Sequence, residues 1–138
     1  MKVENIMSKI FSIGVLIISL GTLLPWGVAA STEVRATTRG FASVGGFIVL
    51  IMSILLGIYT IKKSHSFIFS LATGISAIII SIYYITNPIF PEPPGGMFVG
   101  QVFPGTGVYI TLLGGLTAVS SVILLKFTKS RQSEITPS

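Results

Sequence analysis

The amino-acid sequence predicts an all-α membrane protein in which four transmembrane helices form one bundle, with residues 1–138 as a single domain. Three observations predict this fold. The chain contains four long apolar stretches without Asp, Glu, Lys, Arg or His. Only 9% of its residues are charged, against about 25% in an ordinary soluble domain. Its mean hydropathy is +0.89, and because lipid gives the backbone no hydrogen-bond partners, such stretches are expected to be spanning helices.

The first span is expected over residues 8–25, and its end is marked by Pro25 followed by Trp26. Proline stops a helix and tryptophan favours the membrane interface, so the pair is typical of an interfacial helix end. A second interpretation stays open here. The basic start of the chain, the apolar run and the small residues at 28–30 also fit a secretory signal peptide cleaved before Ser31, which would leave three spans.

The second and third spans are expected over residues 41–61 and 66–86. Each is close to the roughly 20 apolar residues that a membrane helix needs. Lys62 and Lys63 lie between them, so a short basic turn is expected to connect two antiparallel helices.

The fourth span is expected over residues 107–126. Prolines stiffen the preceding loop, residues 87–107, and its glycines permit tight turns. Residues 127–138 are polar, and we expect them to form a short disordered cytoplasmic tail.

Basic residues are distributed unevenly between the two sides of the predicted membrane. One side carries Lys2, Lys9, Lys62, Lys63, Lys126, Lys129 and Arg131, and the other carries Arg35 and Arg39. Because loops rich in Lys and Arg stay in the cytoplasm, the N- and C-termini are predicted to be cytoplasmic in an integral cell-membrane protein. The net charge of +5 does not form a basic patch with stacking aromatics, so nucleic acid is not an expected partner.

Small residues recur at steps of three or four along the predicted helices, which places them on one face of each helix. In lipid, helices associate through close backbone approach and interhelical hydroxyl bonds, so these faces are predicted to pack against one another. The predicted packing residues are Gly46, Ser53, Gly57, Ser70, Thr73, Ala77, Ser81, Thr111, Gly114, Gly115 and Ala118. On the first helix the corresponding face carries Ser8, Ser12, Ser19 and Thr22. The functional alternative is a pore lined by hydroxyls, which would need an oligomer because four helices enclose little space.

The two halves of the chain are similar to each other. Aligning Gly45-Gly46 with Gly114-Gly115 also aligns residues 54–56 with residues 123–125, which read Ile-Leu-Leu in both places. This pattern indicates two duplicated helical hairpins. Chance similarity between apolar helices is the alternative, because both segments use a small set of residue types.

Aromatic residues near the outer helix ends are predicted to anchor the chain at the membrane interface. These anchors are Trp26, Tyr84 and Tyr109. The first outer loop, residues 25–40, is expected to be solvated. In the second outer loop, the candidate partner residues are Phe90, Met97, Phe98 and Phe103. Such exposed apolar side chains either cover the bundle and the interface or contact a partner protein.

The chain resembles small uncharacterised prokaryotic four-helix membrane proteins in three features. These are Leu24-Pro25-Trp26 at the end of the first helix, Lys62-Lys63 after the second, and Gly-Val-Tyr-Ile-Thr-Leu-Leu-Gly-Gly at residues 107–115. Its use of Ile, Ser, Thr and Tyr resembles that of archaeal proteins. The resemblance covers nearly the whole chain and implies a four-helix membrane fold without implying an activity.

The four apolar stretches, residues 10–24, 41–61, 67–85 and 108–125, contain no Asp, Glu, Lys, Arg or His that could serve acid–base or metal chemistry, and cysteine is absent from the chain. We therefore expect no enzyme activity, no metal and no cofactor. The function that this composition favours is an accessory or assembly subunit of a membrane complex, with the lipid bilayer and other membrane subunits or further copies of itself as partners. The alternative is a small-solute permease or channel that acts as an oligomer.

Overall fold

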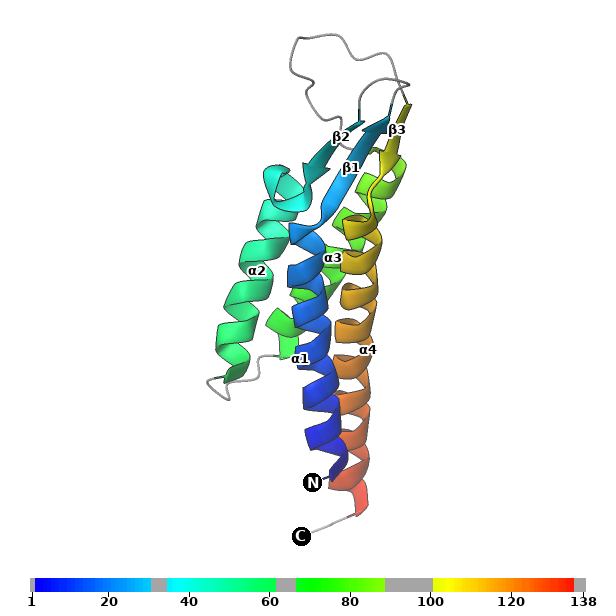
Figure 1. Cartoon of the computed structure of the whole chain (residues 1–138). Coiled ribbons are helices and arrows are strands. Elements are labelled where there is room, and N and C mark those ends of the chain that lie inside the picture. The colour runs from blue at the N-terminus through cyan, green and yellow to red at the C-terminus, as the bar shows by residue number, and fades with distance from the viewer. Residues whose placement is uncertain (1, 31–34, 62–66, 89–100, 136–138) are drawn as a thin grey trace.

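The computed structural model describes residues 2–30, 35–61, 67–88 and 101–135. Its elements in chain order are α1 (Lys2–Leu23), β1 (Pro25–Ala30), β2 (Arg35–Arg39), η1 (Gly40–Ala42), α2 (Val44–Ile61), α3 (Phe67–Thr86), β3 (Gln101–Pro104) and α4 (Thr106–Ile135). The helices lie along one long axis, and a small sheet extends beyond one end of them (Figure 1). We call this the sheet end. We call the opposite end, where α1 begins and α4 ends, the terminal end.

Three of the described helices are long and apolar enough to cross a membrane. The apolar segments are Ile6–Leu23, Phe67–Thr86 and Thr106–Thr128. The second predicted span is shorter than expected, because its apolar helical part is Val44–Tyr59. Residues 40–42 form a 3-10 turn instead, and Ser43 caps the helix by accepting a hydrogen bond from the Gly46 N–H at 3.0 Å.

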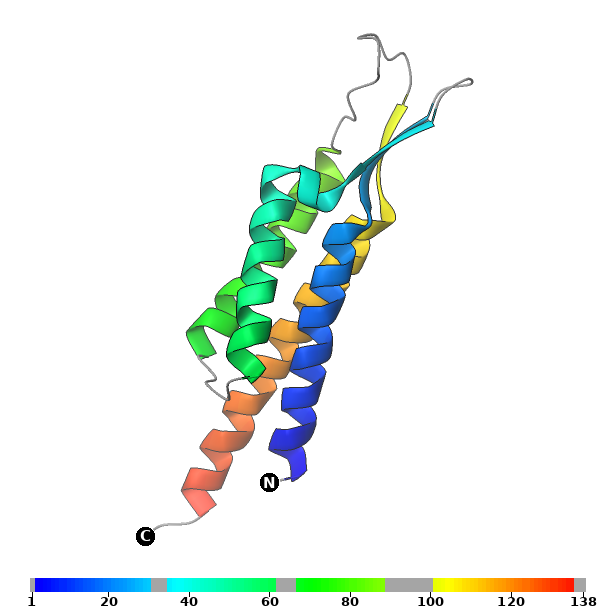
Figure 2. The ribbon, with the colours of Figure 1, turned by 60° about the vertical axis from the view of Figure 1, so that its left-hand side comes forward.

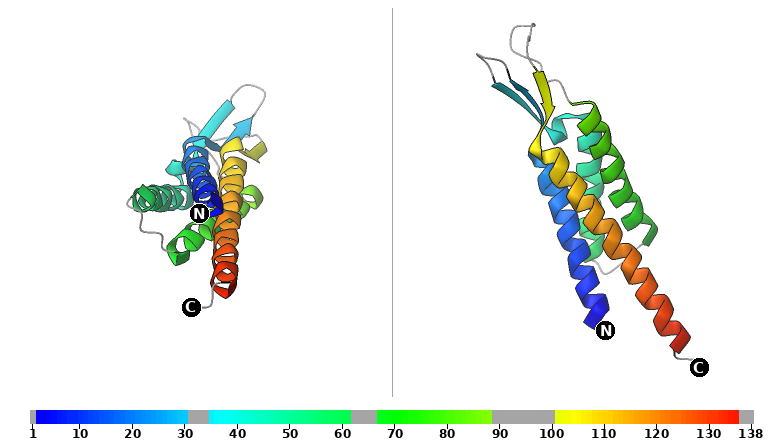
Figure 3. Two further views of the ribbon diagram at one scale, coloured as in Figure 1. Left: turned by 90° about the horizontal axis from the view of Figure 1, so that it is seen from below. Right: turned by 90° about the vertical axis from the view of Figure 1, so that its right-hand side faces the viewer.

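Helix α4 is the longest, with 30 residues. It continues to Ile135, so the prediction that residues 127–138 form a disordered tail was wrong for the described part of that segment. Neither glycine nor proline interrupts the chain between Lys126 and Ile135, and the first helix-breaking residue is Pro137. At the terminal end α4 therefore extends past α2 and α3 (Figure 3).

The three strands correct the prediction of an all-α fold. They form one antiparallel sheet in the order β2-β1-β3, with Val28 of β1 opposite Thr37 of β2 and Phe103 of β3. The loop expected over residues 25–40 is therefore mostly a hairpin. Because β1 follows α1 directly and β3 directly precedes α4, the sheet continues the antiparallel α1–α4 pair beyond the helices (Figure 2).

The helices form a ring in which neighbours are α2–α1, α1–α4, α4–α3 and α3–α2. Its apolar core consists of Phe11, Val15, Ile18, Val49, Leu56, Ala77, Ala118 and Val122. Large apolar side chains also cover the outside of all four helices, as on a surface that faces lipid rather than water. The fold is thus a mostly helical bundle with a small sheet on one end.

Candidate functional site

Helices α1 and α4 touch through their backbones along a line of glycines that we call the glycine seam: Gly14, Gly21, Gly107 and Gly114. The contacts are reciprocal. A Cβ added to Gly14 would lie 3.1 Å from the Gly114 carbonyl oxygen, and one added to Gly114 would lie 2.9 Å from the Gly14 carbonyl oxygen. In the same way, a Cβ added to Gly21 would lie 3.0 Å from the Gly107 carbonyl oxygen, and one added to Gly107 would lie 2.6 Å from the Gly21 carbonyl oxygen. Any larger residue at these positions would force the two helices apart.

Sequence reasoning missed Gly14 and Gly21, because it assigned the packing face of the first helix to hydroxyl residues. The sequence does contain a signal that points to these two glycines. Gly14 and Gly21 are seven residues apart, as are Gly107 and Gly114. Seven residues are close to two helical turns, so a shared spacing of seven aligns two pairs of contact points on antiparallel helices.

The other face of α4 packs against α3 through Gly115. A Cβ on Gly115 would lie 3.1 Å from the Gly74 carbonyl oxygen and 3.3 Å from the Ala77 Cβ. The neighbouring residues Gly114 and Gly115 therefore serve two different helices, α1 and α3. Helix α4 therefore makes close backbone contacts with both of its neighbours in the ring.

Most of the predicted packing residues are buried between helices, but two glycines are not where the prediction put them. The buried ones, besides Gly114 and Gly115, are Ser53, Ser70, Thr73, Ala77, Ser81, Thr111 and Ala118. Gly46 packs against the carbonyl of Gly40, in the turn that precedes its own helix. Among the described residues, a Cβ on Gly57 would meet nothing within 4 Å, so Gly57 does not pack on the described part of this bundle, contrary to the prediction.

The hydroxyl groups bond mainly to their own helices. Thr73 donates to the Phe69 carbonyl and Thr111 to the Gly107 carbonyl, both at 2.9 Å. The backbone carbonyl one turn earlier is always within reach of a Ser or Thr hydroxyl in a helix. It therefore competes with groups on the neighbouring helix for the hydrogen bond that the hydroxyl donates. Within the part of the chain that the structure describes, the hydroxyl pair between helices joins Ser19 of α1 to Ser53 of α2 at 2.9 Å.

Trp26 is fully buried at the sheet end, where it forms what we call the Trp26 junction with Gly21, Gly40, Tyr84 and Gly107. Its indole N–H donates to the Gly21 carbonyl at 2.9 Å, and its ring meets the Tyr84 ring edge-on at 5.3 Å. A Cβ on Gly40 would lie 2.6 Å, and one on Gly107 2.8 Å, from the Trp26 Cδ1. The junction therefore joins α1, the turn before α2, α3 and α4.

This burial corrects the assignment of Trp26 as an interface anchor. Gly40 and Gly107 make room for the indole, so the ring is buried below the sheet and does not face headgroups. Tyr84 is half-buried against Trp26, and Tyr109 is 45% exposed on α4. Their role as anchors stays a prediction.

The candidate partner loop lies largely outside the described residues. Phe90, Met97 and Phe98 fall in residues 89–100, which the structure does not describe. Phe103 belongs to β3, where it is half-exposed opposite Val28.

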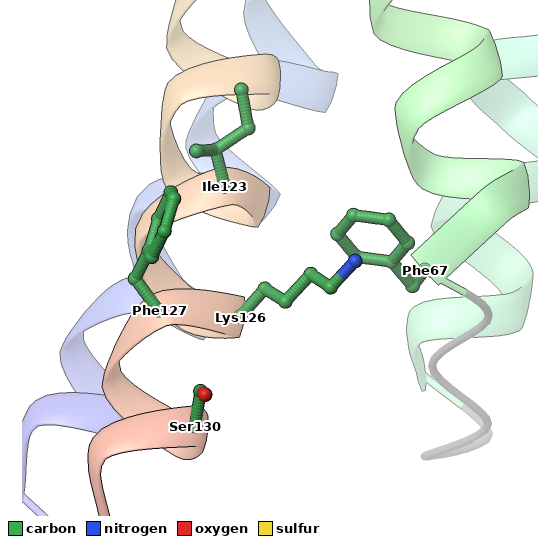
Figure 4. Close-up of a pocket in the computed structure, with 5 residues that line it drawn as sticks. All are labelled: Phe67, Ile123, Lys126, Phe127 and Ser130. Carbon is green, nitrogen blue, oxygen red and sulfur yellow. The ribbon is translucent and has the colours of Figure 1, made fainter.

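A groove opens at the terminal end between the start of α3 and the part of α4 that extends past it. It has a volume of about 340 Å³ and is lined by Phe67, Ile123, Lys126, Phe127 and Ser130. Lys126 reaches across from α4, and its Nζ lies 4.8 Å from the centre of the Phe67 ring (Figure 4). This is the distance of a cation–π contact.

Among the described residues, no three His, Asp or Glu side chains come together as a metal site. Comparison of the chain with family models, curated proteins and solved structures gave no match.

Proposed function

We propose that this chain is a noncatalytic integral membrane protein, an accessory or assembly subunit that packs against larger membrane subunits or further copies of itself. The observation that carries the proposal is the open face of α2 around Gly57. Each of the other described helical glycines has a neighbouring segment within 4 Å of a Cβ placed on it, whereas Gly57 has none. A helix from another subunit could approach the backbone closely there.

Energetics support this interpretation of Gly57. Glycine in a helix interior costs about 0.5–1 kcal/mol relative to alanine, and helices in lipid recover that cost through close backbone contacts. At Gly14 and Gly115 the bundle itself provides such contacts. At Gly57 a helix of a partner subunit would provide the close backbone contact.

The exposed side of α2 is apolar along its length, and its members nearest to Gly57 around the helix are Phe47, Ile54 and Ile58. The exposed large side chains are Val44, Phe47, Ile48, Ile51, Ile54, Leu55, Ile58 and Tyr59. Lipid alone would accommodate these side chains, as it would those on the other helices. They therefore permit contact with a partner helix, and the open backbone at Gly57 favours such a contact. The edges of β2 and β3 that face away from β1 add backbone groups to which a partner outside the membrane could pair.

The absence of a catalytic role is inferred from the polar groups of the spans. Besides tyrosine hydroxyls near the helix ends, they are serines and threonines, and the described serines and threonines bond mostly to their own helix backbones. Such groups supply neither an acid nor a base near neutral pH. The distribution of basic residues supports cytoplasmic termini in this proposal.

The test is to purify the tagged chain from its own membranes in mild detergent and to identify co-purifying subunits by mass spectrometry. We expect stoichiometric membrane partners or a defined homo-oligomer. Gly57→Leu should abolish this association while leaving the thermal stability of the chain unchanged. Ala72→Leu, which likewise places a leucine at an exposed helical position, on α3, is the matched control and should keep the association.

Two outcomes would contradict the proposal. One is association that survives Gly57→Leu at the wild-type level. The other is solute flux into liposomes that contain this chain alone, which would support the permease or channel instead.

A further inference from the structure

We infer that the groove at the terminal end binds one anionic glycerophospholipid, with the lipid phosphate on Lys126 and an acyl chain along Ile123 and Phe67. The inference rests on the proposed membrane function and names a lipid partner for a separate site, which lies between α3 and α4 and not on α2. Its basis is the juxtaposition of one cation with an apolar cleft at the end of a spanning segment.

The groove exists because two neighbouring helices have different lengths. Helix α3 begins at Phe67, whereas α4 continues to Ile135 beyond that level. The part of α4 next to the start of α3 therefore has an uncovered face, on which Ile123 is 40% and Phe127 68% exposed. Figure 4 shows Lys126 crossing the space between the two helices toward the Phe67 ring.

The polarity of the lining follows the polarity of a lipid. Ile123, Lys126, Phe127 and Ser130 recur at steps of three and four, so they share one face of α4. Along this face the apolar Ile123 lies toward the bundle, Lys126 and the aromatic Phe127 lie beyond it, and the Ser130 hydroxyl comes last. An acyl chain in the hydrocarbon and a phosphate at the membrane surface follow the same order.

Charge complementarity selects an anionic lipid. Lys126 lies two residues before the end of the apolar segment Thr106–Thr128, so its long side chain can bring the ammonium to the depth of the headgroups. The Phe67 ring holds this ammonium at the groove, where a phosphate can approach its remaining N–H groups. A zwitterionic headgroup carries its own cation and would gain less from Lys126.

The volume of the groove is sufficient to enclose only part of a phospholipid. About 340 Å³ lies near the lower end of the roughly 300–1,000 Å³ typical of small-molecule pockets. The groove would therefore hold the headgroup region and the first part of one chain, while the rest of the lipid remains in the bilayer.

The test is native mass spectrometry of the purified full chain in mild detergent, titrated with phosphatidylglycerol or with phosphatidylcholine of the same acyl chains. We expect one phosphatidylglycerol to bind first, about tenfold more tightly than phosphatidylcholine. Lys126→Gln should remove most of this preference. Phe67→Leu should weaken it, because the lysine loses the ring that holds it in place.

Lys9→Gln is the matched control, since Lys9 is also an exposed lysine, on α1, the helix that begins at the terminal end. It should leave the preference for phosphatidylglycerol unchanged. Equal binding of both lipids by the wild-type chain would overturn the inference, as would an equal loss in the Lys9 and Lys126 variants. Lipid binding is read independently of co-purifying subunits, so a failure here is distinguishable from a failure of the proposed assembly role.

Discussion

The bundle contains two kinds of helix contact, and the contrast between α4 and α2 shows what separates them. Helix α4 presses its backbone onto α1 at Gly114 and onto α3 at Gly115. Helix α2 meets its neighbours through side chains, with Val49, Ser53 and Leu56 buried, while its own Gly57 faces open space. Where water supplies no hydrophobic force between helices, close backbone contact determines which pairs hold most strongly. We therefore expect α1, α3 and α4 to form the stable centre and α2 to offer a surface to partners.

The sheet end strengthens the same centre. Gly105 donates its N–H to the Trp26 carbonyl at 2.8 Å, just before α4 begins, and the Trp26 junction ties α1 to α4 above the glycine seam. The α1–α4 pair is thus held by backbone contacts along the helices and by strand pairing beyond them.

The largest expected effect comes from removing the indole of the Trp26 junction. Trp26→Ala should lower the free energy of unfolding by about 3–5 kcal/mol, because a fully buried aromatic side chain leaves a cavity and the Gly21 carbonyl loses a donor. Unfolding in detergent, followed by circular dichroism, measures this. A change below about 1 kcal/mol would mean that the α1–α4 pair does not depend on the junction.

A bulky residue in the glycine seam should have the next largest effect. Gly114→Leu places its side chain against the backbone of Ile18 and Gly14, and overpacking of this kind costs about 1–3 kcal/mol or more. Trp26 is the single tryptophan of the chain, so its fluorescence reports whether the separation of α1 and α4 reaches the sheet end.

The matched variant for Gly114→Leu is Gly57→Leu, in which the same change is made on α2. It should leave both the unfolding free energy and the Trp26 emission near those of the wild type, because a side chain at that position meets open space. Similar losses of unfolding free energy in the Gly114→Leu and Gly57→Leu variants would contradict the distinction between α4 and α2.

A smaller effect is expected from the hydroxyl pair between α1 and α2. Ser53→Ala removes the 2.9 Å bond to Ser19 and should cost about 0.6 kcal/mol, the average for such bonds in membrane bundles. Ser19 keeps its bond to the Val15 carbonyl, so no polar group is left without a partner by this change. Thermal unfolding of the two proteins in one detergent gives the difference, and a loss above about 2 kcal/mol would show that α2 is held as firmly as α4.

The smallest effect is expected at Ser81 on α3. Its hydroxyl is fully buried and has no hydrogen-bond partner among the described residues. Ser81→Ala removes that unsatisfied group, so stability should stay the same or rise by up to about 1 kcal/mol. A clear loss of stability would indicate that this hydroxyl has a partner when the protein is in its membrane.

The positions of the helices could be predicted from the sequence more closely than the contacts between them. The predicted span 66–86 differs by one residue at its start from Phe67–Thr86, since long apolar runs are determined locally. The proposed duplication finds less support in the contacts, because Gly46 packs on its own turn whereas the aligned Gly115 packs on α3.

Hydropathy and helical periodicity are local properties, so the long apolar helices and the small residues repeated along them can be read from the amino-acid sequence. Which small residues become contacts depends on the packing of the folded chain, which places Gly14 against Gly114 and leaves Gly57 open. The tertiary structure also decided that Trp26 is buried and that β1 pairs with β3. Those outcomes depend on segments distant in the sequence meeting one another, and no local pattern specifies the partner that a strand edge or a glycine will find.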